Sequence, residues 1–365
     1  MSVVDRVPEY IHSLVPYTPG MPIEEVEREY GIKGSVKLAS NENPLGPSPE
    51  AMRVLRERIS ELHRYPDGDC FYLKRGLAHR LGVAPSRLIF GNGSNELIEL
   101  AIRTFLRPGD EVVLADQAFV IYRLVVQAAG GRCKIIPLRD FTHDLDAMGA
   151  GLSAETRLVF LANPNNPTGT IYRKKQWERF LNRVSAEVLI VVDEAYGEYV
   201  GDPDYPDSLD DGGANKNILT LRTFSKMYGL AGLRIGYGIG PEPIVAMMHR
   251  LRQPFNVNAA AQWAALAALE DHAHKARTLE TNRQGMEFLQ EKLARLGIRY
   301  VPSEANFLLI RVGDGREVFQ GLLRRGVIVR PMQEYGLPEY IRVTVGTKEE
   351  NQKFIAELEG VAREA

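Results

Sequence analysis

Short apolar runs alternate with segments of helical spacing from residue 87 to about residue 240. The runs lie at 87–90, 111–115, 133–138, 157–162, 188–192 and 218–221. After the first run, one helix face is marked at the expected spacing by Leu97, Leu100, Ala101 and Phe105. Strands that are apolar throughout and separated by helices form a mostly parallel sheet with helices on both faces. The sequence therefore predicts an α/β fold, to which 236–239 adds an antiparallel strand.

The chain ends in a smaller unit of another kind. Strand patterns at 298–302, 307–312, 327–330 and 340–345 are flanked by helix patterns at 315–325 and 348–363, which predicts an α+β domain. Residues 1–44 are rich in Pro and Gly, with one helix pattern at 23–30, and predict an arm laid over other structure. We therefore expect an arm at 1–44, a large domain at 45–265 and a small domain at 266–365.

The composition excludes several classes of protein. A net charge of −2 over 365 residues favours neither nucleic acid nor an anionic membrane as a partner. Cys70 and Cys133 form no disulfide framework and lack the spacing of a zinc site, so we expect a reducing, cytoplasmic setting. Residues 1–17 hold no apolar stretch of the length that a signal peptide or a membrane span needs. The sequence motifs of metalloproteases and serine hydrolases are also absent.

Polar segments follow several of the expected strands, where open parallel sheets bind their ligands. Residues 91–96 (GNGSNE) precede a helix pattern, and free amides at a helix N-terminus attract phosphate; the alternative is a hairpin turn at Asn-Gly. Residues 163–169 (NPNNPTG) form a rigid turn that can aim the Asn166 amide at a ligand oxygen; the alternative is a turn and nothing more.

Asp193 directly follows the apolar run 188–192, where an unpaired carboxylate is costly. A pyridinium nitrogen is a suitable partner, because the carboxylate keeps it protonated and the ring then accepts electrons from a substrate carbanion. The alternatives are a metal ligand and a helix cap, and no second cluster of metal-ligating residues is evident. Tyr196, three residues on, is close enough in sequence to reach the same ring.

Lys226 follows the last apolar run, in the segment TFSK at 223–226. A partly desolvated lysine has a lowered pKa and acts as a nucleophile and proton shuttle; the alternative is a solvated surface lysine. Thr223, Ser225 and Arg234 are candidates for binding a phosphate, and Phe119 for stacking on a planar ring or for core packing. An amine, a carboxylate, a phenol, an amide and an arginine at one sheet edge suit a phosphorylated aromatic aldehyde held as a Schiff base, which means pyridoxal 5'-phosphate.

These segments together resemble the fold-type I pyridoxal-phosphate-dependent aminotransferases and, among them, the histidinol-phosphate aminotransferase family. The resemblance covers nearly the whole chain. Its marks are PYTPG (16–20), LASNENP (38–44), RYPD (64–67), GNGSNE (91–96), NPNNPTG (163–169), DEAY (193–196), TFSKMYGLAGLR (223–234), RQPFNVN (252–258) and RVTVGT (342–347). Two positions depart from the family's usual residues: Asn95 replaces an aspartate, and Phe119 replaces a tyrosine.

The resemblance implies roles for individual residues. Lys226 forms the Schiff base, Asp193 pairs with the pyridine nitrogen, and Asn166 and Tyr196 hold the ring oxygen. Phe119 stacks on the ring. The cofactor phosphate is bound by Ser94, Asn95, Thr223, Ser225 and Arg234, and by Tyr65 of a neighbouring subunit. The implied assembly is a homodimer to which the arm contributes.

The resemblance also implies substrate-binding residues. Arg342 grips the substrate α-carboxylate, while Arg330 and Tyr17, the latter from a partner's arm, are candidates for a substrate phosphate. Asn43 is a further candidate for substrate binding. The implied reaction converts histidinol phosphate and 2-oxoglutarate to imidazole-acetol phosphate and L-glutamate, in histidine biosynthesis. The alternatives are an aromatic amino-acid aminotransferase and a threonine-phosphate decarboxylase, which differ in side-chain preference or in the bond that is broken.

Overall fold

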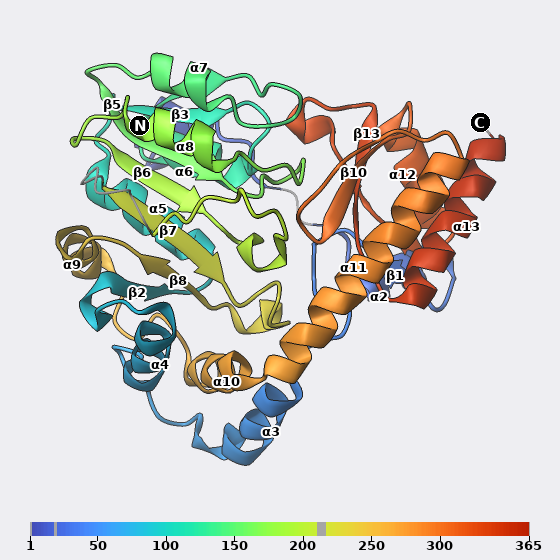
Figure 1. Cartoon of the computed structure of the whole chain (residues 1–365), viewed down its shortest axis with the longest axis horizontal. Helices are drawn as coiled ribbons and strands as arrows, with labels where there is room; N and C mark the ends of the chain where they lie inside the picture. The colour runs from blue at the N-terminus through green and yellow to red at the C-terminus, as the bar shows by residue number, and fades with distance from the viewer. Residues whose placement is uncertain (1, 18–19, 210–216, 365) are drawn as a thin grey trace.

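The computed structural model describes residues 2–17, 20–209 and 217–364, and within these ranges seven strands form one mixed sheet (Figure 1). Their order across the sheet is β2-β8-β7-β6-β5-β3-β4. The strands are β2 (Leu88–Gly91), β3 (Glu111–Ala115), β4 (Arg132–Ile136), β5 (Thr156–Ala162), β6 (Leu189–Asp193), β7 (Ile218–Thr223) and β8 (Gly236–Ile239). Strands β4, β3, β5, β6 and β7 run parallel, and β8 runs antiparallel to β7 and β2, which confirms the predicted mostly parallel sheet.

Helices cover both faces of this sheet because successive strand residues are apolar on both sides. Val112 and Leu114 of β3 pack toward α5 (Ser94–Phe105), α6 (Val120–Ala128) and α9 (Glu242–Leu251). Val113, between them, packs toward α7 (Leu145–Ala150) and α8 (Lys174–Leu181) on the opposite face. Three further helices, α3 (Pro49–Arg58), α4 (Phe71–Leu81) and α10 (Ala259–Glu270), pack together beside β2 and β8.

A second, antiparallel sheet lies in the C-terminal part of the chain, in the order β12-β13-β10-β9. Its strands are β9 (Tyr300–Val301), β10 (Phe307–Arg311), β12 (Arg330–Pro331) and β13 (Tyr340–Thr344). The helices α12 (Gly315–Arg324) and α13 (Lys348–Glu364) pack against each other beside it. This arrangement agrees with the predicted α+β unit.

The prediction of a single strand at 327–330 is wrong. The structure has two short strands there, and each belongs to a different sheet. β11 (Val327–Ile328) pairs in parallel with β1 (Val36–Lys37), whereas β12 pairs antiparallel with β13. The change of sheet at Val329 attaches the N-terminal arm to the small unit and brings Arg330 directly opposite Arg342.

The arm touches both units. α1 (Glu9–His12) lies on α6, where Gln127 Nε2 donates to the Tyr10 carbonyl at 3.2 Å, and α2 (Ile23–Tyr30) buries Val26 against Leu323 and Ile328. Short 3₁₀ turns complete the described chain at Val4–Arg6, Ile59–Glu61, Pro85–Arg87, Gly197–Tyr199, Ala231–Leu233 and Gln333–Tyr335. The domain limit at residue 265 stays a prediction, because α11 (His272–Arg295) runs without a break from the α3–α10 pair to the second sheet (Figure 1).

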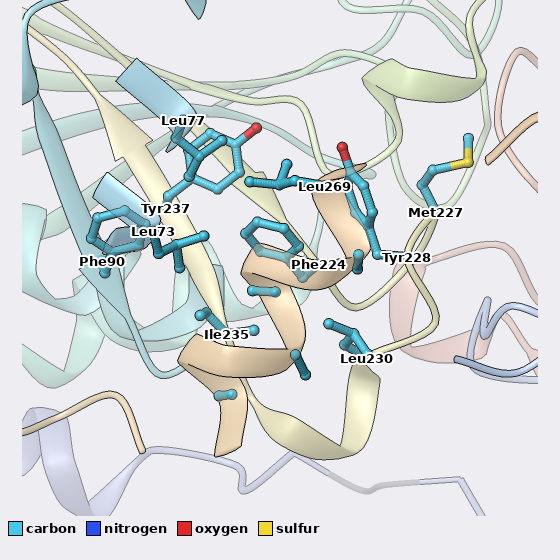
Figure 2. Close-up of a cluster of buried hydrophobic side chains, with 14 of the residues drawn as sticks. Leu73, Leu77, Phe90, Phe224, Met227, Tyr228, Leu230, Ile235, Tyr237 and Leu269 are labelled. Atoms are coloured by element: carbon cyan, nitrogen blue, oxygen red, sulfur yellow. The ribbon is translucent and has the colours of Figure 1, made fainter. Parts of the chain in front are cut away.

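A buried apolar cluster anchors the segment that follows β7. Phe224, Tyr228 and Leu230 point into this cluster, together with side chains from α4, β2, β8 and α10 (Figure 2). The Phe224 ring lies 4.9 Å from that of Tyr228 and 5.6 Å from that of Tyr237, measured between centroids. Lys226 is therefore held between residues that are fixed in the core.

The same segment packs tightly, at Gly229, against Gly46, two residues beyond the arm. Its φ is +68°, and a Cβ placed there would lie 2.1 Å from the carbonyl oxygen of Gly46. Both the left-handed backbone and the close approach require glycine here. Gly232, three residues further on, has open space around the position of a Cβ.

Gly229→Ala should therefore destabilise the protein by about 2 kcal/mol or more, because it adds backbone strain and a steric clash. The melting temperature should fall by several degrees. Gly232→Ala, in the same loop, is the matched control and should change the melting temperature little. Equal melting temperatures for the two variants would contradict the close packing of this loop against Gly46.

Candidate active site

The carboxyl ends of the parallel strands open into a cavity of about 410 Å³. Most of the side chains that the sequence singled out line this cavity. They are Tyr17, Ser94, Asn95, Phe119, Asn166, Asp193, Tyr196, Thr223, Ser225, Lys226, Arg234, Arg330 and Arg342. Residues more than two hundred positions apart in the sequence thus meet in one place, at two apolar strand ends, a turn and a helix N-terminus.

A larger hollow of about 1270 Å³ lies elsewhere, between the 50–73 region and α10. Its lining includes Tyr65 and Trp263 but neither Lys226 nor Asp193. Volume alone would favour this hollow as a ligand site. The chemistry belongs to the smaller cavity, because the nucleophilic amine and the buried carboxylate line that one.

Lys226 is partly buried, and its Nζ donates a hydrogen bond to the Ser40 carbonyl at 2.9 Å. Burial, together with the positive charge of Arg342, lowers the pKa of this amine from 10.5 to about 7. Nζ lies 5.7 Å from the centre of the Tyr196 ring. A large fraction of the amine is therefore neutral near pH 7, and a neutral amine is a nucleophile and a base.

Asp193 ends β6 and is buried, with two hydrogen-bond donors directed at its carboxylate. Tyr122 donates its hydroxyl proton to Oδ2 at 2.7 Å, and the Ala195 amide donates to Oδ1 at 3.0 Å. Burial raises the pKa of Asp193, while the Tyr122 hydrogen bond opposes that shift. Burial also raises the pKa of Tyr122, so this phenol stays a donor. The site is built to hold a carboxylate that still needs a cationic partner.

Tyr196 and Asn166 present a phenol and an amide to the same cavity. The Tyr196 oxygen accepts a hydrogen bond from Asn41 Nδ2 at 2.9 Å, and burial raises the pKa of Tyr196 to about 12, so its hydroxyl keeps its proton. Asn166 Oδ1 accepts from Arg342 Nη1 at 2.5 Å. That bond turns the Asn166 side chain toward Arg342.

An anion cradle lies where α5 begins. The backbone amides of Ser94 and Asn95 open the first turn of this twelve-residue helix. Gly93 has φ +78°, and a Cβ there would lie 2.5 Å from Arg234 Nη2, so only glycine lets the guanidinium approach the helix N-terminus. A helix N-terminus beside an arginine binds phosphate. The predicted phosphate role, rather than a hairpin turn, fits this geometry.

Two arginines line the opposite side of the cavity, on β12 and β13. Arg342 is buried and donates to the Ala39 carbonyl at 2.6 Å as well as to Asn166. The Arg330 Cζ lies 5.3 Å from the centre of the Tyr17 ring. This Tyr17 belongs to the same chain, and its supply from a partner's arm stays a prediction. The arm itself docks on both units of its own chain.

Two predicted residues are not brought to the cavity. Asn43 directs its amide inward, where Nδ2 donates to the Met227 carbonyl at 2.9 Å and to Thr278 Oγ1 at 3.0 Å. It therefore supports the lysine loop and does not line the substrate space. Tyr65 is 84% exposed, stacks on Phe255 with centroids 5.0 Å apart, and lines the larger hollow.

The sequence reasoning missed several residues of the cavity. They are Ser40, Asn41, Glu42, Tyr122 and Tyr335. Tyr122 lies in α6, and only its tertiary contact with Asp193 shows its role. Asn41, with φ +55°, belongs to a motif whose position over the site depends on the pairing of β1 with β11. Among the described residues, no cluster of three or more potential ligands is arranged for a metal ion, and no helix is both long and apolar enough to cross a membrane.

The lowered pKa of Lys226 predicts an unusual labelling profile. A small aldehyde with a hydride reductant modifies only neutral amines, so labelling of Lys226 should stay nearly constant above about pH 8 and fall about tenfold per pH unit below about pH 6. Ordinary lysines should keep gaining reactivity up to about pH 10. Peptide mass spectrometry on protein freed of bound aldehydes measures both in one sample. A Lys226 profile that follows the exposed lysines would contradict the shift.

Known proteins share this architecture. The sequence model of the family described as "Aminotransferase class I and II" matches residues 33–358. The histidinol-phosphate aminotransferase of Moorella thermoacetica is 49% identical over 360 residues, which cover 98% of this chain and 93% of that protein. A relative of the same name from Akkermansia muciniphila is 45% identical over 364 residues, which cover 99% of this chain and 100% of that protein.

A solved structure extends the likeness to three dimensions and confirms the predicted fold-type I architecture. The histidinol-phosphate aminotransferase of Sinorhizobium meliloti, in complex with pyridoxal-5'-phosphate, superimposes with a TM-score of 0.88 at 28% identity and 98% coverage of both chains. The family match spans most of the chain, and the identity to the Moorella protein extends over nearly all of it. This chain belongs to the class I and II aminotransferases.

Proposed function

We propose that this protein is a pyridoxal-phosphate-dependent aminotransferase that converts histidinol phosphate and 2-oxoglutarate to imidazole-acetol phosphate and L-glutamate. The observation that carries the proposal is the meeting of Lys226 and Asp193 in one cavity with two arginines. Relatives 49% identical over nearly the whole chain bear the name of this activity. The reaction belongs to histidine biosynthesis, and the cytoplasmic setting expected from the two isolated cysteines remains part of the proposal.

The residues of the cavity fit pyridoxal 5'-phosphate. Among the described residues, the hydrogen-bond donors to the buried Asp193 carboxylate are the neutral Tyr122 hydroxyl and Ala195 amide, which leaves its charge available to a pyridinium nitrogen. The Gly93–Arg234 cradle at the N-terminus of α5 suits the phosphate, with Thr223 and Ser225 beside it on the cavity wall. Phe119 supplies an aromatic face. When bound, the cofactor supplies an electron sink for the charge that develops on the substrate Cα.

The chain's own residues supply the remaining chemistry. Lys226 would hold the cofactor through Nζ, and the same amine, when free, would be the base that takes the Cα proton. The Tyr122 hydroxyl donates to Asp193 and favours its ionised form, in which the carboxylate would keep the ring nitrogen protonated. Tyr196 and Asn166 are the candidates for holding the ring oxygen, and Arg342 orients the substrate through a carboxylate. Burial of these groups excludes water and strengthens each interaction.

The proposed activity is tested by a substrate panel with purified protein. Histidinol phosphate with 2-oxoglutarate should turn over, and L-glutamate alone should bleach the absorbance of the bound cofactor. Lys226→Ala should lower turnover by about 10³-fold or more, because the attaching amine and the base are both lost. Phenylalanine and threonine phosphate serve as the comparison substrates. Faster turnover of phenylalanine, or release of carbon dioxide from threonine phosphate, would assign one of the two alternative activities.

The proposal includes a homodimer with shared sites. Tyr65 is exposed and does not line the cavity of its own chain. It lines the larger hollow, and other large apolar side chains near that hollow are exposed as well. These are Ile59, Leu62, Phe71 and Tyr72. An exposed apolar surface of this kind favours contact with a second copy. In that assembly Tyr65 of one subunit would reach the cofactor phosphate of the other.

Complementation tests this sharing. Lys226→Ala and Tyr65→Ala proteins, each weakly active at limiting cofactor, are mixed after mild unfolding and refolding. If Tyr65 acts across the interface, half of the dimers carry one intact site, and about a quarter of the wild-type activity returns. Each variant refolded alone is the control. If activity stays at the level of the controls while mixed dimers form, Tyr65 does not act across the interface.

A further inference from the structure

Two of the arginines that line the cavity, Arg330 and Arg342, are direct neighbours across a strand pair. Arg330 of β12 lies opposite Arg342 of β13 in an antiparallel register, so both side chains project from the same face of the sheet. Both line the cavity. Like charges directly opposite each other across two strands are destabilising. Each guanidinium therefore needs acceptors on its own side of the pair.

The acceptors of the two arginines differ in kind. Arg342 donates to neutral oxygens, the Asn166 amide and the Ala39 carbonyl. Arg330 instead donates through Nη2 to Glu334 Oε2 at 2.9 Å. The Arg330 side chain is 11% exposed, whereas that of Glu334 is 48% exposed. The Glu334 carboxylate can therefore turn into water without burying a charge, while Arg330 stays in place.

The two substrates of the proposed function carry their anions at different distances from the reacting carbon. L-Glutamate has a carboxylate bonded to Cα. Histidinol phosphate has a CH₂–O–phosphate group at the same position, so its anion lies two atoms further out. The carboxylate suits Arg342, which the family resemblance assigns to it. The longer, doubly charged phosphate extends toward the neighbouring Arg330.

We propose that Glu334 is a resident counter-ion of Arg330, which the substrate phosphate displaces and the substrate α-carboxylate leaves in place. This inference rests on the proposed function. Glu334 is then a specificity-determining residue, because its negative charge weakens binding of the phosphate substrate and does not affect binding of L-glutamate. Because the Glu334 side chain is 48% exposed, water screens its pairing with Arg330, so the exchange costs little and remains reversible in each catalytic cycle.

The test compares holoenzymes, whose cofactor phosphate site is filled, of the wild type and Glu334→Gln. Inorganic phosphate, measured as a competitive inhibitor of the L-glutamate half-reaction, should bind about three to five times more tightly to the variant. KM for histidinol phosphate should fall by a similar factor with kcat nearly unchanged. KM for L-glutamate should stay the same. Glu339→Gln, which removes the partner of Arg311 on the surface of the same unit, is the matched control and should change none of these constants.

Weaker or unchanged phosphate binding in Glu334→Gln would overturn the inference, since it would make Glu334 a support for Arg330 and not its competitor. Equal tightening for L-glutamate would overturn it as well. In an Arg330→Gln background the Glu334→Gln change should have no effect on phosphate, and a persisting effect would locate the cause elsewhere. If the wild type fails to react with histidinol phosphate, the proposed function fails, but the inorganic phosphate measurements still decide the role of Glu334.

Discussion

The site depends on the desolvation of Asp193 and Lys226. Burial raises the pKa of the carboxyl group and lowers that of the amine, so it pushes both groups toward their neutral forms. The Tyr122 hydroxyl and the Ala195 amide oppose this for Asp193. The outcome is a reactive amine near a carboxylate whose hydrogen-bond donors among the described residues are neutral. The amine suits one end of a planar cationic ring, and the carboxylate suits the opposite end.

The arm makes this arrangement possible from the other side of the cavity. Ser40 accepts the Lys226 hydrogen bond, Asn41 bonds the Tyr196 oxygen, and Asn43 holds the Met227 carbonyl. Gly46, two residues beyond the arm, packs against Gly229 in the lysine loop. Because β1 pairs with β11, these contacts connect the small unit to the lysine segment of the large one. Arg342 and Arg330, which come from the small unit, thereby face the residues at the ends of the parallel strands.

Much of this was predictable where chemistry follows a local pattern. The strand ends at Asp193 and Thr223 and the helix N-terminus at Ser94 are visible as apolar runs that stop at polar residues, and parallel strands bring such ends to one edge. The position of Asn43 could not be predicted for a physical reason. Asn43 belongs to the arm, whose path depends on contacts with distant helices and strands and not on its own periodicity. The strand expected at 327–330 failed likewise, because a change of sheet leaves no mark on hydrophobicity.

The sequence by itself determined the α/β architecture, the order of its strands along the chain, and the residue types available for amine, carboxylate and phosphate chemistry, because these follow from local hydrophobic periodicity and turn residues. Only the tertiary structure decided that Tyr122 bonds Asp193, that Asn43 faces inward, and that Arg330 and Arg342 stand side by side with Glu334 as an added charge. These relations join segments far apart in the chain, and burial and register, which no local pattern encodes, fix them.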